Sequence, residues 1–225
     1  MDWLTRRRAA ALLAGALVLC VLFVDRPVAL YMQRKVYGTP LFDWALRIFP
    51  VLLGAGACLA LLFVCFGGAA LLGRQLRPWM SVVLAAAGAG MAALLLAELL
   101  KFGIGRSWVY PTYLSEGIFG VRPLRGGPGY GAFPSATAAV AGAALLVLWE
   151  AWPRGRPAYG FVLFAIAVAI LVTNSHWASD LLGGALLGGW VGGLVLRWCG
   201  RTGTRTGTVS AGPSRPAGIA ADQES

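Results

Sequence analysis

A histidine and an aspartate toward the end of the chain have a spacing that suits catalysis. His176 and Asp180 lie four residues apart in the segment His-Trp-Ala-Ser-Asp, and His176 is the only histidine in the sequence. Residues four apart share one face of a helix. The carboxylate can then fix the imidazole tautomer and leave the other ring nitrogen as a nucleophile or base. The spacing fits equally well a helix-start histidine beside an aspartate that balances Lys101 or Arg106.

A second polar cluster, Gly-Ala-Phe-Pro-Ser-Ala-Thr at residues 131–137, opens an apolar run. Pro134 and Ser135 are residue types typical of the start of a helix. Backbone N–H groups in a first helical turn have no acceptor within the helix, and they bind anions. The segment therefore favours an anion site, with an ordinary helix start after a glycine-rich loop as the alternative.

A third cluster, residues 98–106, ends an earlier apolar run and carries two cations. Lys101 and Arg106 would add positive charge to a phosphate held by the second cluster. Glu98 lies three residues before Lys101, and we expect the two to form an ion pair within one helix.

The composition around these clusters is that of a membrane protein. The 225 residues are 58% hydrophobic and 12% charged, with a mean hydropathy of +0.72, whereas a soluble domain carries about 25% charged residues. The formal charge of +10 comes from 17 Arg and 2 Lys dispersed between apolar runs, which does not indicate nucleic-acid binding. Arginine-rich usage of this kind is typical of a GC-rich bacterial genome. Charges at membrane depth cost about 2.5–3.5 kcal/mol each on insertion scales, so all three clusters are functional candidates.

Six uncharged runs are long enough to predict six transmembrane helices. None alternates with a period of two, which argues against a membrane barrel. We therefore expect an all-α integral membrane bundle over residues 1–200 and a flexible cytoplasmic tail over 201–225. Gly184, Gly188 and Gly192, spaced by four, predict close helix packing in the last run. The runs are 9–24, 48–73, 78–97, 134–149, 157–174 and 181–196, the last extended backwards through His176.

Six spans place both termini on one side of the membrane, and the charges predict that this side is cytoplasmic. Eleven arginines fall on that side and eight cations on the other, which carries the three polar clusters and is expected to be extracytoplasmic. The first run resembles a signal peptide. However, Val-Asp-Arg-Pro at 24–27 is not a small-residue cleavage site, so we expect a retained anchor.

Together the three clusters resemble the motifs of the type 2 phosphatidic acid phosphatase superfamily, also called the acid phosphatase/haloperoxidase superfamily. Its pattern is Lys-x6-Arg-Pro, then Pro-Ser-Gly-His, then Ser-Arg-x5-His-x3-Asp. The resemblance implies an integral-membrane lipid phosphatase or phosphotransferase in which His176 forms a phosphohistidine and Asp180 orients it. It also implies that Lys101, Arg106 and Ser135 bind the phosphate of a lipid phosphate or diphosphate substrate.

The sequence departs from this pattern at three places. Trp108 stands where the family has arginine, Ala136 and Thr137 replace Gly-His, and Ile170 replaces a second arginine. In the family, the histidine missing at 137 would protonate the leaving group. Its loss should matter least when the leaving group is itself a phosphate, which favours a lipid diphosphate substrate. The alternative is a catalytically impaired relative that binds lipid phosphates or acts as a partner protein.

A loop before the second cluster carries two arginines that would compensate for the missing ones. Arg122 and Arg125 lie in a turn-rich segment, and their guanidinium groups are expected to lie over the phosphate. Contact with lipid headgroups from a solvated loop is the alternative. No metal or cofactor is expected, because the single histidine is already assigned and no carboxylate cluster has ligand spacing.

Overall fold

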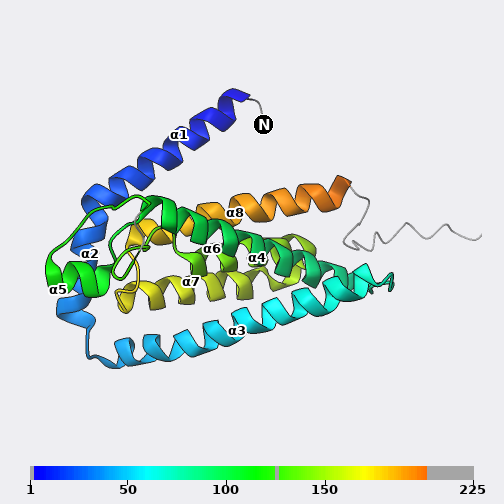
Figure 1. Ribbon diagram of the computed structural model, residues 1–225, viewed down its shortest axis with the longest axis horizontal. Coiled ribbons are helices and arrows are strands. Elements are labelled where there is room, and N and C mark those ends of the chain that lie inside the picture. Colours follow the sequence, from blue (N-terminus) through cyan, green and yellow to red (C-terminus); the bar gives the residue numbers. More distant parts are fainter. Residues whose placement is uncertain (1–2, 125–126, 202–225) are drawn as a thin grey trace, which may run out of the picture.

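Most of the residues that the structure describes lie in helices (Figure 1). The structure is a computed structural model and describes residues 3–124 and 127–201, among which there are two isolated β-bridges and no strand. This confirms the all-α fold. Beyond Arg201, the predicted tail lies outside the described residues.

The first span is longer than its apolar run and is irregular. It starts with α1 (Trp3–Leu19) and continues through a π-helical turn η1 (Cys20–Val24), α2 (Asp25–Tyr31) and a second π-helical turn η2 (Met32–Val36). The part apolar enough to cross a membrane is Ala11–Val36, whereas the sequence predicted 9–24. The run ends at Asp25 but the helix does not, because the Asp25 carboxylate has partners inside the protein.

The remaining long helices overlap the predicted runs, but the helix predicted at 48–73 begins at Pro40 and the one predicted at 78–97 continues to Ile104. Five helices in the described part of the chain are long and apolar enough to cross a membrane, and α6 (Ala136–Ala151) is a shorter apolar one of 16 residues. Short elements η3 (Val109–Tyr113), α5 (Leu114–Glu116) and η4 (Pro153–Gly155) lie in the connections. The long helices after the first span are α3 (Pro40–Leu71), α4 (Pro78–Ile104), α6 (Ala136–Ala151), α7 (Arg156–Val172) and α8 (Ala178–Arg201).

Small residues pack α6 between α4 and α8. The buried core is mostly alanine, with Ala89 and Ala93 on α4, Ala139 and Ala143 on α6, and Val191 on α8. Without a hydrophobic driving force between helices in lipid, close backbone approach supplies the van der Waals contact that holds them together. Large apolar side chains on α3 lie instead on the outside of the bundle, where they suit contact with lipid.

Three glycines of α8, Gly184, Gly188 and Gly192, form a glycine stripe along which α8 packs closely against α6. A Cβ atom at Gly184 would meet the carbonyl oxygen of Ser135, one at Gly188 that of Ala139, and one at Gly192 that of Ala143. The obstacles are backbone atoms of α6, so only glycine permits this separation. This confirms the packing role that the four-residue spacing predicted.

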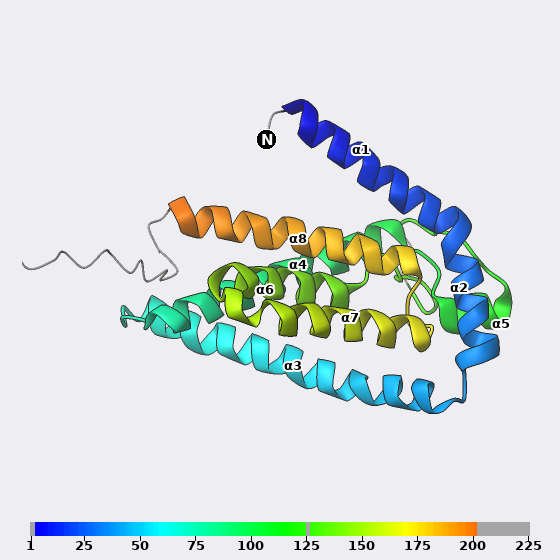
Figure 2. The same ribbon diagram turned by 180° about the vertical axis from the view of Figure 1, so that it is seen from behind.

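The three polar clusters lie at the same end of the bundle. The last turn of α4 and the first turns of α6 and α8 meet there, and α2 crosses this end (Figures 1 and 2). The loop between α4 and α6 covers the same end and carries η3 and α5. The fold therefore brings the clusters together at one end of the bundle.

Candidate active site

Direct hydrogen bonds join the three clusters around the segment that precedes α6. The N–H groups of Gly131 and Ala132 donate to the carbonyl oxygen of Arg106, at 2.7 and 3.0 Å. The N–H of Ser135 donates to the carbonyl oxygen of Asp180 at 3.0 Å. The clusters predicted separately from the sequence thus form one site.

The His176 ring is held through its Nδ1 atom. Nδ1 lies 2.8 Å from the carbonyl oxygen of Ala132 and 3.6 Å from Oδ2 of Asp180. A carbonyl oxygen only accepts, so in the neutral imidazole Nδ1 carries the proton and Nε2 keeps its lone pair. The sequence predicted that the carboxylate fixes the tautomer, but the nearer acceptor is the carbonyl, which no side-chain pattern reveals. The ring is 9% exposed, and the ring of Trp108 packs against it with centroids 4.8 Å apart.

Asp180 is fully buried, and both of its carboxylate oxygens have donors. Oδ1 accepts from Nη1 of Arg106 at 2.6 Å, and Oδ2 accepts from the backbone N–H of Trp177 at 3.0 Å. The second bond fixes the start of α8, where His176 and Asp180 face each other. Asp180 therefore links the imidazole to the helix and to a buried cation.

The Arg106 guanidinium, expected to bind substrate, is directed at protein groups. It is 6% exposed, and Nη1 donates to the Ser179 hydroxyl at 2.5 Å as well as to Asp180. Nη2 donates to Oδ2 of Asp25 at 2.6 Å. Sequence reasoning missed Asp25 as a site residue. The available signal was an acidic residue at the end of the first apolar run.

Ser135 caps α6 and lies beside Asp180. Its hydroxyl oxygen accepts from the N–H of Ala138 at 3.4 Å, and the residue is fully buried. The N–H groups of Ala136 and Thr137, in the first turn of α6, have no acceptor within the helix. These two N–H groups are the ones at the start of α6 that remain available to an acceptor from outside the helix.

Lys101 lies in the last turn of α4, next to the same segment. Its Nζ forms an ion pair with Oε1 of Glu98 at 2.8 Å, which is the predicted intrahelical pair. The Glu98 side chain is 55% exposed and that of Lys101 is 17% exposed. A Cβ built on Gly131 would lie 3.9 Å from Cβ of Lys101, so the lysine borders the segment that opens α6.

The loop arginines are described only in part. Arg122 is exposed, and its guanidinium lies 4.6 Å from the centroid of the Tyr130 ring. The backbone N–H of Arg122 donates to the carbonyl oxygen of Gly105 at 2.7 Å, and this bond connects the loop to the end of α4. Arg125 lies outside the described residues. Ile170, where the resemblance expected an arginine, is 1% exposed in α7, so this position contributes an apolar contact.

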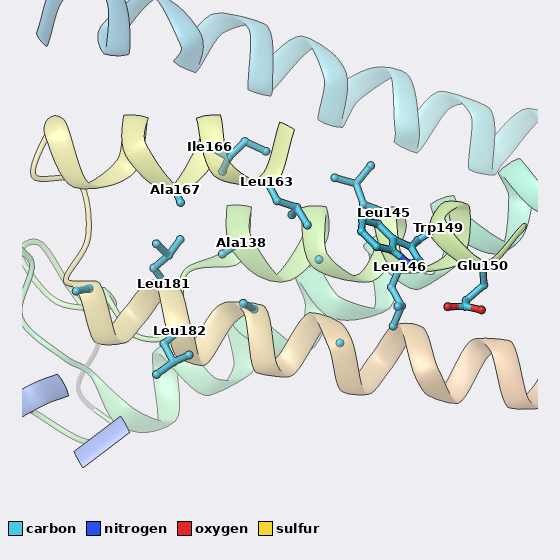
Figure 3. Close-up of a pocket in the computed structure, with 14 residues that line it drawn as sticks. Ala138, Leu145, Leu146, Trp149, Glu150, Leu163, Ile166, Ala167, Leu181 and Leu182 are labelled. Carbon is cyan, nitrogen blue, oxygen red and sulfur yellow. The ribbon is translucent and has the colours of Figure 1, made fainter. Parts of the chain in front are cut away.

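An apolar groove runs along α6, α7 and α8 from the site end of the bundle (Figure 3). Its volume is about 560 Å³. Ala138, Ala178 and Leu181 line it near the site, and Trp149 and Glu150 line its far end. The groove therefore runs from Ala178, two residues after His176, to the Trp149 end of α6.

Comparison with known proteins places this site in a family. The sequence model of the PAP2 superfamily matches residues 78–203, more than half of the chain and all three clusters. The chain belongs to the PAP2 superfamily. This confirms the resemblance read from the motifs, and with the apolar helices it makes the protein a multi-pass PAP2 membrane protein.

Two individual PAP2 proteins resemble the chain. A 97-residue segment is 31% identical to the lipid A 1-phosphatase of Rhizobium etli; it covers 43% of this chain and 41% of that protein, less than half of its length. A solved structure, the first transmembrane PAP2 type phosphatidylglycerolphosphate phosphatase from Bacillus subtilis, matches with a TM-score of 0.49 and 15% identity. That match covers 85% of this chain and 96% of the other.

Proposed function

We propose that this protein is an integral-membrane lipid phosphatase or phosphotransferase that works through a phosphohistidine at His176. The observation that carries the proposal is the Nδ1 contact with the carbonyl oxygen of Ala132, because it leaves the Nε2 lone pair available. Membership of the PAP2 superfamily and the similarity to a lipid A 1-phosphatase support a lipid phosphate as the substrate.

The reaction has two steps. The Nε2 lone pair forms a bond to phosphorus while the P–O bond to the leaving group breaks, and the leaving oxygen keeps that electron pair. Water, or an acceptor hydroxyl in a transfer, then adds to phosphorus. The P–N bond breaks, its electron pair returns to Nε2, and the proton of the incoming O–H passes to solvent.

The phosphate would be held at the start of α6. In our proposal, the Ser135 hydroxyl, the first-turn N–H groups of α6 and the Lys101 ammonium surround it. Arg122 would contribute from the loop. The geometry of Arg106 supports a contribution through Asp180, because its Nη1 and Nη2 donors point to buried protein oxygens.

The hydrocarbon chain of the substrate would lie in the apolar groove along α6, α7 and α8. The groove begins beside Ala178, two residues after His176, and its lining is almost entirely apolar. A chain in the groove places the headgroup at the site end of the bundle, where the charged groups are. This arrangement supports a lipid over a soluble phosphate.

We expect lipid diphosphates to be hydrolysed at least about 10²-fold faster than the matching monophosphates. A general acid contributes about 10²–10⁴-fold, or roughly 3–5 kcal/mol of barrier, and Thr137 cannot supply a proton near neutral pH. A phosphate leaving group needs that proton far less than an alkoxide. The measurement is phosphate release by purified protein from isoprenyl diphosphates, isoprenyl monophosphates and phosphatidic acid.

The same panel tests the proposed function as a whole. Fast release from phosphatidic acid with little from the diphosphates would overturn the substrate preference. Folded protein that releases no phosphate from any of these lipids would favour the alternative, a lipid-phosphate-binding or partner protein that has lost catalysis. The observation that favours this alternative is Trp108, which packs on the His176 ring at a position where the family pattern has an arginine.

We further propose that both termini are cytoplasmic and that the site faces the extracytoplasmic side. Two of the cations assigned to the site side, Lys101 and Arg106, belong to the proposed site, so the remaining Lys and Arg favour a cytoplasmic location for the other side. In intact cells a membrane-impermeant maleimide should label a Glu116→Cys variant. An Arg154→Cys variant, exposed in η4 at the other end, should be labelled only after the cells are opened. The reverse pattern would refute this orientation.

A further inference from the structure

Asp25 is a buried carboxylate that belongs to the first span and reaches the site from outside the family match. It is 1% exposed, begins α2, and precedes residues 78–203, which the PAP2 sequence model covers. Its Oδ2 accepts from Nη2 of Arg106 and from the hydroxyl of Ser179, both at 2.6 Å. Its Oδ1 accepts from the backbone N–H of Ser179 at 2.9 Å. These donors satisfy the Asp25 carboxylate, which a charge buried at this depth requires.

These contacts continue to His176 through buried groups alone. Arg106 bridges Asp25 and Asp180, and Ser179 accepts from Arg106 while it donates to Asp25. Oδ2 of Asp180 then lies 3.6 Å from Nδ1 of the imidazole. A displacement of the guanidinium therefore moves the carboxylate that faces His176.

The charges of this network favour the covalent step. One guanidinium shared by two carboxylates leaves one net negative charge beside the imidazole. The ring becomes positively charged when Nε2 forms its bond to phosphorus while Nδ1 stays protonated, and a fixed negative charge stabilises that state. Without Asp25, Arg106 would pair with Asp180 alone and neutralise it, and one end of the guanidinium would lose its acceptor.

We propose that Asp25 is a positioning residue for the His176–Asp180 pair, acting through Arg106 and Ser179. The proposal rests on the proposed function of His176. It makes the first span, whose α2 crosses the site end of the bundle (Figure 2), part of the catalytic machinery. The competing role is docking of the first span against α8, which would affect folding but leave the turnover of folded protein unchanged.

The test compares Asp25→Asn, Asp25→Glu and a neighbouring control, Arg26→Gln, in detergent-purified protein. Arg26 is exposed, and its guanidinium lies over the Phe119 ring and forms none of the hydrogen bonds that join Asp25, Arg106 and Ser179. We expect Asp25→Asn to lower kcat roughly 10- to 100-fold with KM nearly unchanged, because the nucleophile is misplaced while the phosphate contacts remain. Asp25→Glu should recover part of kcat, and Arg26→Gln should retain it.

A double-mutant cycle identifies the route. In an Arg106→Gln background, Asp25→Asn should cause no further loss of kcat, because the connection is already broken. Losses that multiply would show that Asp25 does not act through Arg106. A lowered Tm with wild-type kcat in the folded fraction would assign Asp25 to docking, and either result overturns the proposal.

Orthovanadate binding gives a readout that does not need turnover. Vanadate accepts a bond from the histidine nucleophile as phosphorus does, so Asp25→Asn should weaken its Kd roughly tenfold while Tm stays constant. Turnover that is sensitive to His176 but insensitive to Asp25 would overturn the positioning role alone. Wild-type protein that neither turns over lipid phosphates nor binds vanadate would overturn the proposed function, and the positioning role with it.

Discussion

Replacing His176 by glutamine is expected to lower phosphate release by roughly 10⁴-fold or more, about 5.5 kcal/mol in the barrier. Glutamine keeps a polar group that can reach the carbonyl oxygen of Ala132, but its amide nitrogen has no lone pair available to attack phosphorus. KM should change far less than kcat, because the proposed phosphate contacts come from Lys101 and the start of α6. The measurement is steady-state phosphate release on the best substrate of the lipid panel.

Two controls accompany this variant. Its Tm in detergent should stay close to that of the unmodified protein, so that lost activity reflects lost chemistry. Glu116→Gln removes an exposed carboxyl group from the loop at the same end of the bundle and should leave the rate unchanged. A His176→Gln protein that kept most of its activity would contradict a histidine nucleophile.

Replacing Gly188 by alanine is expected to destabilise the bundle by about 1–3 kcal/mol. The added methyl group would meet the Ala139 carbonyl oxygen and the Ala143 backbone nitrogen, and neither can yield unless α6 moves away from α8. Because Ser135 caps the start of α6, the same movement would also disturb the site. For a chain of this length 1 kcal/mol corresponds to about 2–4 °C in Tm, which thermal unfolding in detergent resolves.

The neighbouring Gly189 is the matched control. A Cβ there has nothing within 4 Å, so Gly189→Ala should be neutral or slightly stabilising through its higher helix propensity. Equal Tm values for the two variants would show that the glycine stripe does not set the separation of α6 and α8.

The helices and the three clusters could be predicted because each leaves a local signal. Uncharged runs of sufficient length gave the spans, and the four-residue glycine spacing gave the contact of α8 with α6. His176 and Asp180 were found because their spacing places them on adjacent turns, and Lys101 with Glu98 for the same reason. Such signals need only a few consecutive residues.

What the sequence could not show depends on contacts between distant segments. Asp25 is 154 positions from Ser179 in the sequence, and its role exists only when the first span crosses the end of the bundle. The acceptor for His176 is a backbone carbonyl at Ala132, which has no residue-type signature. Arg106 was predicted as a phosphate ligand because its charge was known and the two carboxylates that surround it were not.

The most direct measurement is to trap the covalent intermediate. Protein mixed with a lipid diphosphate labelled in its terminal phosphate is quenched in alkaline detergent, and the labelled peptide is identified by mass spectrometry. We expect a phosphoryl group on His176 that is stable to alkali and released by acid, as a P–N bond requires, and no label in His176→Gln. Steady turnover without label on His176, or with an acid-stable label on another residue, would contradict the phosphohistidine mechanism.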